Sequence, residues 1–172
     1  TLIPEVKVAW DHFSEAGFFS AHYDFEDGGM QLPEVVLRAS MAYFNAANIA
    51  TAGYPFLTLG AANLISTFAS QAHRDTFLPP MQDGRFAGTM ALTEPGQGSA
   101  LADIKTIAKP ADDGSYRIFG NKMYISGGDQ NITDNIVHMV LAKIEGAPSG
   151  AKGISLFICP KFLVNPDGSL GE

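Results

Sequence analysis

The stretch that decides the fold is GRFAGTMALTEPGQGS, residues 84–99. Before Gly84 the apolar residues recur at three- and four-residue steps, which is typical of one face of a helix. After Gly84 short β-type runs are separated by turns rich in Gly, Asn and Asp. Helices that come first and strands that come second favour an α+β fold, with a helical N-terminal domain at 1–85 and a small antiparallel β-sandwich or barrel domain at 86–172.

The helical half has one strongly amphipathic segment, at 33–48, where Pro33 suits a first helical turn. A second helix is expected at 59–72 and a weaker one at 5–15. A short helical turn at 73–78 is expected to end at the two prolines that follow it. The aromatic residues between the first two helices are expected to lie in the core; they are Phe18, Phe19, Tyr23 and Phe25. The strands are expected at 86–93, 105–110, 116–119, 123–126, 136–144 and 153–159.

Composition limits the classes of function. With 172 residues and 46% hydrophobic residues, the chain is long enough for one substantial core or two small ones. The net charge of −7, without any block of Lys and Arg, excludes a stripe that would attract nucleic acid. No run of about 18 apolar residues predicts a membrane span. We therefore expect a soluble, cytoplasmic protein.

Single residues add little chemistry outside one region. The lone cysteine, Cys159, cannot form an internal disulfide and lies in an apolar run, so a buried thiol is expected. The four histidines lack metal-ligand spacing, and no metal site is expected. The chain begins at Thr1 and ends soon after the turn at 165–169, so we expect it to be a piece of a longer protein.

The region that suggests chemistry is an apolar run followed by a glycine-rich loop. Met90, Leu92 and Thr93 can form an apolar wall with a hydroxyl, and the two glycines of Gly96-Gln97-Gly98 leave space for a flat, phosphate-bearing ligand. Ser99 offers a further donor. A second hydroxyl is expected at Ser126, which follows Tyr124 and Ile125 and precedes a Gly-Gly turn. Each feature alone is weak, and the information lies in their order and spacing.

Taken together, Thr89–Ser99 and Gly120–Gly128 resemble the two flavin signatures of the acyl-CoA dehydrogenase family. The segment Leu78–Gly88 resembles the family's link between its helical and β domains. The segments Asn135–Lys143 and Lys152–Phe157 resemble the larger bacterial members, including those that act on methylthiopropionyl-CoA. The resemblance covers nearly the whole chain, from about Phe13 onward.

The resemblance implies an FAD-dependent oxidoreductase of fatty acid metabolism. A carboxylate would remove the α-proton of an acyl-CoA thioester, and the β-carbon would pass a hydride to flavin N5, giving the 2-enoyl-CoA. An electron-transfer flavoprotein would reoxidise the FAD, and a homo-oligomer is expected. The catalytic base would be a glutamate in a C-terminal helical domain that is absent from this chain.

The resemblance also assigns residues. Met90, Leu92 and Thr93 would line the flavin, with Thr93 at its pyrimidine end. Gly98 and Ser99 would meet the cofactor phosphates, and Met90 and Ser99 would also meet the acyl-CoA. Three residues of the second signature would cover the dimethylbenzene and central rings, with the hydroxyl donating toward N5; they are Tyr124, Ile125 and Ser126.

Two positions depart from the family pattern. Ala100 stands where the family usually has an acidic residue, for which Asp103 is a partial substitute, and Ser126 stands where it usually has Thr. Glu94 lies inside the first signature but is not expected to be the base. Alternative functions are an acyl-CoA oxidase, or a non-catalytic flavin-binding stress-response relative that binds DNA. The isolated piece is expected to be inactive.

Overall fold

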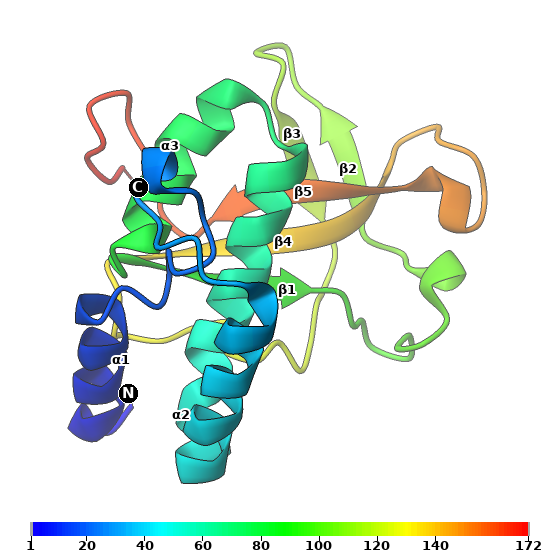
Figure 1. Cartoon of the computed structure of the whole chain (residues 1–172). Helices are drawn as coiled ribbons and strands as arrows, with labels where there is room; N and C mark the ends of the chain where they lie inside the picture. Colours follow the sequence, from blue (N-terminus) through cyan, green and yellow to red (C-terminus); the bar gives the residue numbers. More distant parts are fainter. Residues whose placement is uncertain (1, 172) are drawn as a thin grey trace. The chain divides into compact units, whose positions relative to one another are not determined.

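The computed structural model describes residues 2–171 and divides them into two compact units (Figure 1). The helical unit contains the chain up to Thr89, Ser126–Val137 and the residues from Pro160 onward. The sheet unit contains Met90–Ile125 and His138–Cys159. Each unit is therefore built from segments that lie far apart in the sequence.

Three helices form most of the helical unit: α1 (Pro4–Glu15), α2 (Glu34–Phe68) and α3 (Gln71–Gln82). In Figure 1, α1 lies beside the N-terminal part of α2, as their shared core contacts require. The predicted helix at 5–15 is confirmed. The side chains buried in this core include Trp10, Phe13, Phe19, Met41 and Leu59.

The helix predicted at 33–48 and most of the one predicted at 59–72 fall in one element, α2, which ends at Phe68, so the predicted end at 72 was wrong. Its helical geometry is interrupted only at Asn48, where φ is −162° and ψ is 102°. The side-chain oxygen of Asn48 accepts a hydrogen bond from the Thr51 amide at 3.0 Å, so Asn48 caps a new helical segment. The predicted gap was wrong because Pro55 is tolerated inside this segment, where its ring is buried.

The helix predicted at 73–78 is also longer than expected. The Ser70 side chain accepts a hydrogen bond from the His73 amide and caps α3 at its start. The helix then passes through Pro79 and Pro80, and the Asp83 amide closes its end on the Pro79 carbonyl at 3.0 Å. Proline has a φ compatible with a helix, but it removes a donor and its ring crowds the carbonyl of the preceding turn, and burial of Pro80 offsets this cost.

The strands form one five-stranded sheet in the order β1-β4-β2-β3, with β5 also paired to β4. Strand β2 runs antiparallel to β3, with Ile107 opposite Phe119. It runs parallel to β4, with Ile107 opposite Lys143, so the sheet is mixed and not wholly antiparallel as expected. The long connection from β3 to β4 allows this parallel pairing. The strands are β1 (Phe86–Ala91), β2 (Ile107–Pro110), β3 (Tyr116–Phe119), β4 (Asn135–Ile144) and β5 (Ile154–Pro160).

The strand predicted at 123–126 does not form. Tyr124 has a φ of +58° and Gly127 a φ of +65°, and a strand cannot continue through the left-handed region. The segment is irregular, although its alternation of residue types resembles a strand. The other predicted strands are confirmed with small shifts of their ends.

The predicted aromatic core is partly right. Phe19 and Tyr23 are buried, whereas Phe25 is 69% exposed.

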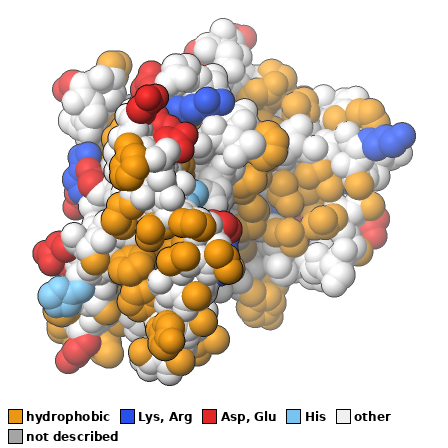
Figure 2. Space-filling view, viewed as in Figure 1, with side chains coloured by type: hydrophobic (Ala, Val, Ile, Leu, Met, Phe, Trp, Pro, Cys, Tyr) orange, Lys and Arg blue, Asp and Glu red, His pale blue; other side chains and the backbone are white. Residues whose placement is uncertain are grey.

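Helix α2 also carries exposed apolar side chains, and Figure 2 shows hydrophobic side chains gathered where α2 lies in Figure 1. Within residues 2–171, no helix combines the length and the apolar character that crossing a membrane would require. The exposed apolar side chains of α2 include Val35, Tyr43, Ile49, Phe56 and Phe68.

Candidate functional site

The first candidate segment begins at the end of β1. Met90 is partly exposed, Leu92 and Thr93 are half-buried, and a tight turn follows. The Glu94 amide donates to the Gln97 carbonyl at 2.9 Å, and the Gln97 amide donates back to the Glu94 carbonyl at 3.0 Å. This turn is closed by its own backbone and does not need a ligand to hold its shape.

The glycines of the turn leave open space beside the backbone. A Cβ atom added at Gly96 or Gly98 would meet no atom within 4 Å. Gly96 also has a φ of +79°, which other residues rarely adopt. Ser99 is exposed, and so is Asp103 in the short helix that follows. The loop therefore has open space beside its backbone, and the binding of a ligand there stays a prediction.

The second candidate segment lies against the first. The Met123 amide donates to the Thr93 carbonyl at 3.0 Å, which joins residues 30 positions apart. Tyr124 is 85% exposed, and Ile125 is half-buried. The structure thus brings Thr93 together with the segment that carries Tyr124 and Ile125. Ser126 is exposed and opens the next segment of the helical unit, so its predicted place beside the flavin stays a prediction.

A buried carboxylate, Glu94, lies at the centre of these segments and is only 5% exposed. It accepts hydrogen bonds from the amides of Lys105 at 2.6 Å and Thr106 at 3.0 Å, and from the Thr106 hydroxyl at 2.5 Å. Lys122 Nζ lies 2.9 Å from its Oε1 and also donates to the Leu92 carbonyl at 3.0 Å. The pair therefore joins the two candidate segments through side chains as well as backbone.

Sequence reasoning considered Glu94 only as a proton acceptor and missed this pair. The signal was present, because a charge that directly follows an apolar strand must find a partner if it is buried. Lys122 is the positive charge within the second candidate segment. Burial alone would raise the pKa of Glu94, but hydrogen bonds from Thr106, Lys105 and Lys122 outweigh it and lower that pKa to about 2. A carboxylate of this kind is a poor proton acceptor at neutral pH.

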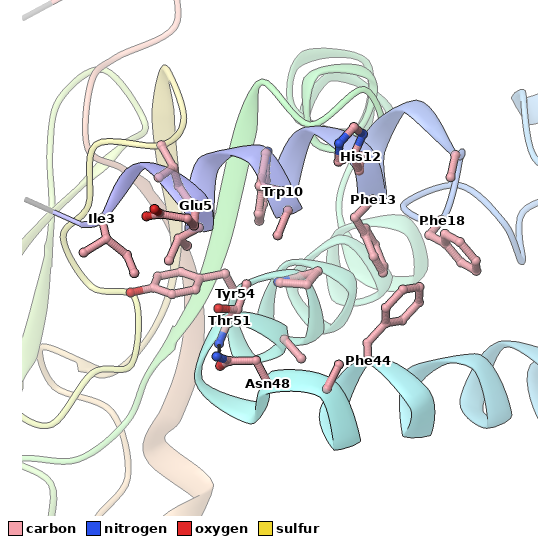
Figure 3. Close-up of a pocket in the computed structure, with 17 residues that line it drawn as sticks. Ile3, Glu5, Trp10, His12, Phe13, Phe18, Phe44, Asn48, Thr51 and Tyr54 are labelled. Carbon is pink, nitrogen blue, oxygen red and sulfur yellow. Dashed lines mark hydrogen bonds between the residues drawn. The ribbon is translucent and has the colours of Figure 1, made fainter.

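A separate cavity of about 510 Å³ lies in the helical unit, between α1 and α2 (Figure 3). Phe13, Phe18 and Phe44 gather at one end of it, and Tyr54 lies near Ile3 at the other. Its lining is mostly apolar and includes no residue of the two candidate segments. This cavity is therefore not the predicted flavin site.

Two other expectations concern side chains outside the candidate segments. Cys159 is half-buried, and burial raises the pKa of its thiol, which lowers its reactivity. Among the residues from 2 to 171, no group of three His, Cys, Asp or Glu side chains is placed to hold a metal ion.

Comparison with known protein families gives two matches that together span most of the chain. The family described as acyl-CoA dehydrogenase, N-terminal domain, matches residues 3–85. The family described as acyl-CoA dehydrogenase, middle domain, matches residues 89–168. The chain belongs to the acyl-CoA dehydrogenase family. The resemblance found in the two signature segments is therefore confirmed.

Individual family members agree with this assignment. The 3-methylmercaptopropionyl-CoA dehydrogenase of Ruegeria pomeroyi is 40% identical over 172 residues, which is 99% of this chain and 29% of that protein. An acyl-CoA dehydrogenase of Bacillus anthracis, solved in complex with FAD, is 26% identical with a TM-score of 0.77, over 92% of this chain and 26% of that one.

A third relative comes from a structure of an electron transferring flavoprotein of Acidaminococcus fermentans. Its matching chain is 26% identical with a TM-score of 0.77, over 90% of this chain and 40% of that one. The chain thus spans less than half of the length of each of these three relatives.

Proposed function

We propose that this chain supplies the flavin-binding part of an FAD-dependent acyl-CoA dehydrogenase, which converts an acyl-CoA thioester to its 2-enoyl form. The observation that carries the proposal is the 3.0 Å hydrogen bond from the Met123 amide to the Thr93 carbonyl. It holds Met90–Ser99 of the first signature beside Gly120–Ile125 of the second, within the sheet unit. The family relatives and their printed activities support the same conclusion.

The side chains of these segments suit an isoalloxazine ring and its pyrophosphate. Met90 and Leu92 offer apolar surface, and Tyr124 presents a largely exposed aromatic ring. The open space beside Gly96 and Gly98 would let phosphates approach the backbone closely. When bound, FAD supplies the acceptor for the hydride that leaves the β-carbon of the thioester.

The proposal gives each site residue a role. Thr93 would donate to the pyrimidine end of a bound flavin. Tyr124, Ile125 and Ser126 would cover the dimethylbenzene and central rings, and the Ser126 hydroxyl would donate toward N5. Gly98 and Ser99 hold the phosphates, and Met90 and Ser99 contact the acyl-CoA. Glu94 is excluded as the base because its carboxylate is buried and engaged by Thr106, Lys105 and Lys122.

The partners follow from the same reading. We propose acyl-CoA as substrate and an electron-transfer flavoprotein as electron acceptor, since one of the relatives comes from a structure of such a flavoprotein. A homo-oligomer and a cytoplasmic location stay predictions. So does the division of the chain into a helical domain at 1–85 and a β domain at 86–172.

The test uses the full-length protein that contains this chain. It is purified, its visible absorption is recorded, and dye reduction is measured with butyryl-CoA, methylthiopropionyl-CoA and longer acyl-CoAs. We expect bound FAD and dye reduction with at least one thioester. Absence of flavin, or bound flavin that no acyl-CoA reduces, would overturn the proposal. Oxygen uptake without dye would instead favour an acyl-CoA oxidase.

A further inference from the structure

We propose that Lys122, held in place by Glu94, is a positioning residue that orients the Leu92–Thr93 peptide unit and the Thr93 side chain toward the flavin. This inference rests on the proposed function, since it concerns the same site. It assigns a purpose to a buried ion pair to which the proposed function gives no part in proton transfer.

The hydrogen bond from Lys122 sets the direction of one peptide unit. In a planar trans peptide, the carbonyl oxygen and the amide hydrogen point in opposite directions. The Leu92 carbonyl is bound by Lys122 Nζ at 3.0 Å, and the described chain contains no cis peptide bond. The N–H of Thr93 therefore points away from Lys122.

Thr93 is fixed from both sides. The peptide unit before it is held by Lys122, and the carbonyl after it accepts from the Met123 amide at 3.0 Å. With both flanking peptide units oriented, the direction of the Thr93 Cα–Cβ bond is set as well. The amide of Thr93 and the Cβ atom that carries its hydroxyl are thus positioned before any ligand arrives, which lowers the cost of binding.

Glu94 keeps Lys122 in this position. A lysine side chain is long and flexible, and its ammonium group is strongly hydrated, so it turns to water unless a partner holds it. Lys122 is only 12% exposed and lies 2.9 Å from a carboxylate that Thr106 and Lys105 immobilise. The pair therefore acts as one rigid unit.

Gly120 lets the second signature segment pack closely against Thr106, which holds Glu94. A Cβ atom at Gly120 would lie 2.4 Å from the Thr106 hydroxyl oxygen and 2.9 Å from the Thr106 Cα. Gly120 also has a φ of +156°. The absence of a side chain lets the segment approach Thr106 closely enough for Lys122 to reach Glu94.

The experiment compares four variants of the full-length protein: Lys122→Met, Glu94→Gln, the double variant, and Lys109→Met as a control. Lys109 also forms an ion pair, 3.1 Å from Glu145, but that pair is exposed and lies outside the two signature segments. For each variant we measure the dissociation constant of FAD, the absorption spectrum of the FAD-saturated protein, and the urea midpoint of unfolding.

Either single substitution leaves a buried charge without its partner, so both should lower the urea midpoint, and the double variant should recover part of the loss. Methionine cannot donate to the Leu92 carbonyl, so FAD affinity should not recover. We expect Lys122→Met and the double variant both to bind FAD about tenfold more weakly, the effect of one charge-assisted hydrogen bond. Their flavin spectra should be shifted, while Lys109→Met behaves as the parent.

The outcomes separate the two proposals. If the parent protein binds no FAD, the proposed function fails. If the parent binds FAD but FAD affinity changes in parallel with the urea midpoint in all variants, Lys122 has no positioning role. The same conclusion follows if the flavin spectra of Lys122→Met and the parent coincide. If the single variants do not fold, the FAD affinity of the double variant tests the inference. A double variant that binds FAD as tightly as the parent protein overturns it. A double variant that cannot fold also overturns it, since the pair is then required for the fold.

Discussion

The contacts inside the helical unit differ in kind from some of those inside the sheet unit. In the helical unit the centre of the Phe13 ring lies 4.8 to 5.2 Å from the ring centres of three other aromatic residues, Phe18, Phe19 and Phe44. The sheet unit also buries apolar residues such as Ile104 and Val140, but among them lies the carboxylate of Glu94, which is held by hydrogen bonds. Apolar contacts fill volume without fixing direction, whereas hydrogen bonds fix the orientation of each group. The signature segments lie where orientation is fixed.

The largest expected effect is at the aromatic core. Phe13 is 5% exposed, so Phe13→Ala leaves a cavity beside three rings and should destabilise the full-length protein by about 3–5 kcal/mol. Urea unfolding followed by tryptophan fluorescence measures it, because Trp10 lies in the same core. Phe25→Ala is the matched control, since Phe25 is 69% exposed. Equal losses in the two variants would contradict this account of the helical unit.

The next largest effect on the free energy of unfolding is expected at the buried Glu94–Lys122 pair, and it depends on pH. Glu94→Gln leaves Lys122 without its counter-charge and should cost about 3 kcal/mol at pH 7, at the low end for a buried pair because Lys122 can still reach water. The pKa of Glu94 is lowered from 4.5 to about 2 in the folded chain. Its stabilising effect is therefore complete above pH 4.5 and is lost as the pH falls toward 2.

Urea midpoints of the parent and of Glu94→Gln, taken from pH 7 down to pH 2, test this dependence. The difference between the two free energies of unfolding should stay constant above about pH 5 and shrink below it, since Glu94 takes up a proton near pH 4.5 in the unfolded parent but only near pH 2 in the folded one. A difference that stays constant down to pH 2 would mean that Glu94 titrates normally and that the polar network does not hold it.

A smaller effect is expected from a glycine of β1. A Cβ atom at Gly88 would lie 2.5 Å from the Ala61 Cβ and 2.9 Å from the Met81 Cε, so Gly88→Ala should destabilise by about 1–3 kcal/mol through overpacking. At Gly60 in α2, nothing lies within 4 Å, and Gly60→Ala should stabilise by about 0.5–1 kcal/mol. Thermal unfolding of both variants reports the two signs. Stabilisation by Gly88→Ala would mean that the helical core is not tightly packed there.

The features that were predicted correctly from the sequence are local ones. The helix at 5–15 and most strands follow from periodicity and turn residues within short windows, whereas the two signature segments were identified by their resemblance to a family. The failures depend on distant contacts. Pro80 stays in a helix because the core buries it, and Tyr124 leaves the strand region in a segment tied to the Thr93 carbonyl through Met123.

The candidate site shows the same division. The residues of each signature could be identified from the sequence, because their order and spacing are contained within about ten positions. The Glu94–Lys122 pair joins residues 28 positions apart, and its burial depends on how the strands pair. No periodic pattern predicts such a pair, although the presence of a charge in each signature indicates that one is possible.

The smallest effect on the free energy of unfolding is expected at an exposed ion pair, which is compared here with the buried pair of the same unit. Lys109 lies 3.1 Å from Glu145, with both side chains about half exposed, and its ammonium lies 5.7 Å from the centre of the Phe119 ring. Water screens this pair, so Lys109→Met should change the free energy of unfolding by less than about 1 kcal/mol, even with the cation–π contact. The change should shrink further in 1 M NaCl, whereas that of Glu94→Gln should not, because buried charges are poorly screened. Urea unfolding at low and high salt compares the two. An equal cost for both pairs would show that burial and the hydrogen bonds from Thr106 add nothing to the Glu94–Lys122 pair, and the contrast between the two units would then rest on the aromatic core alone.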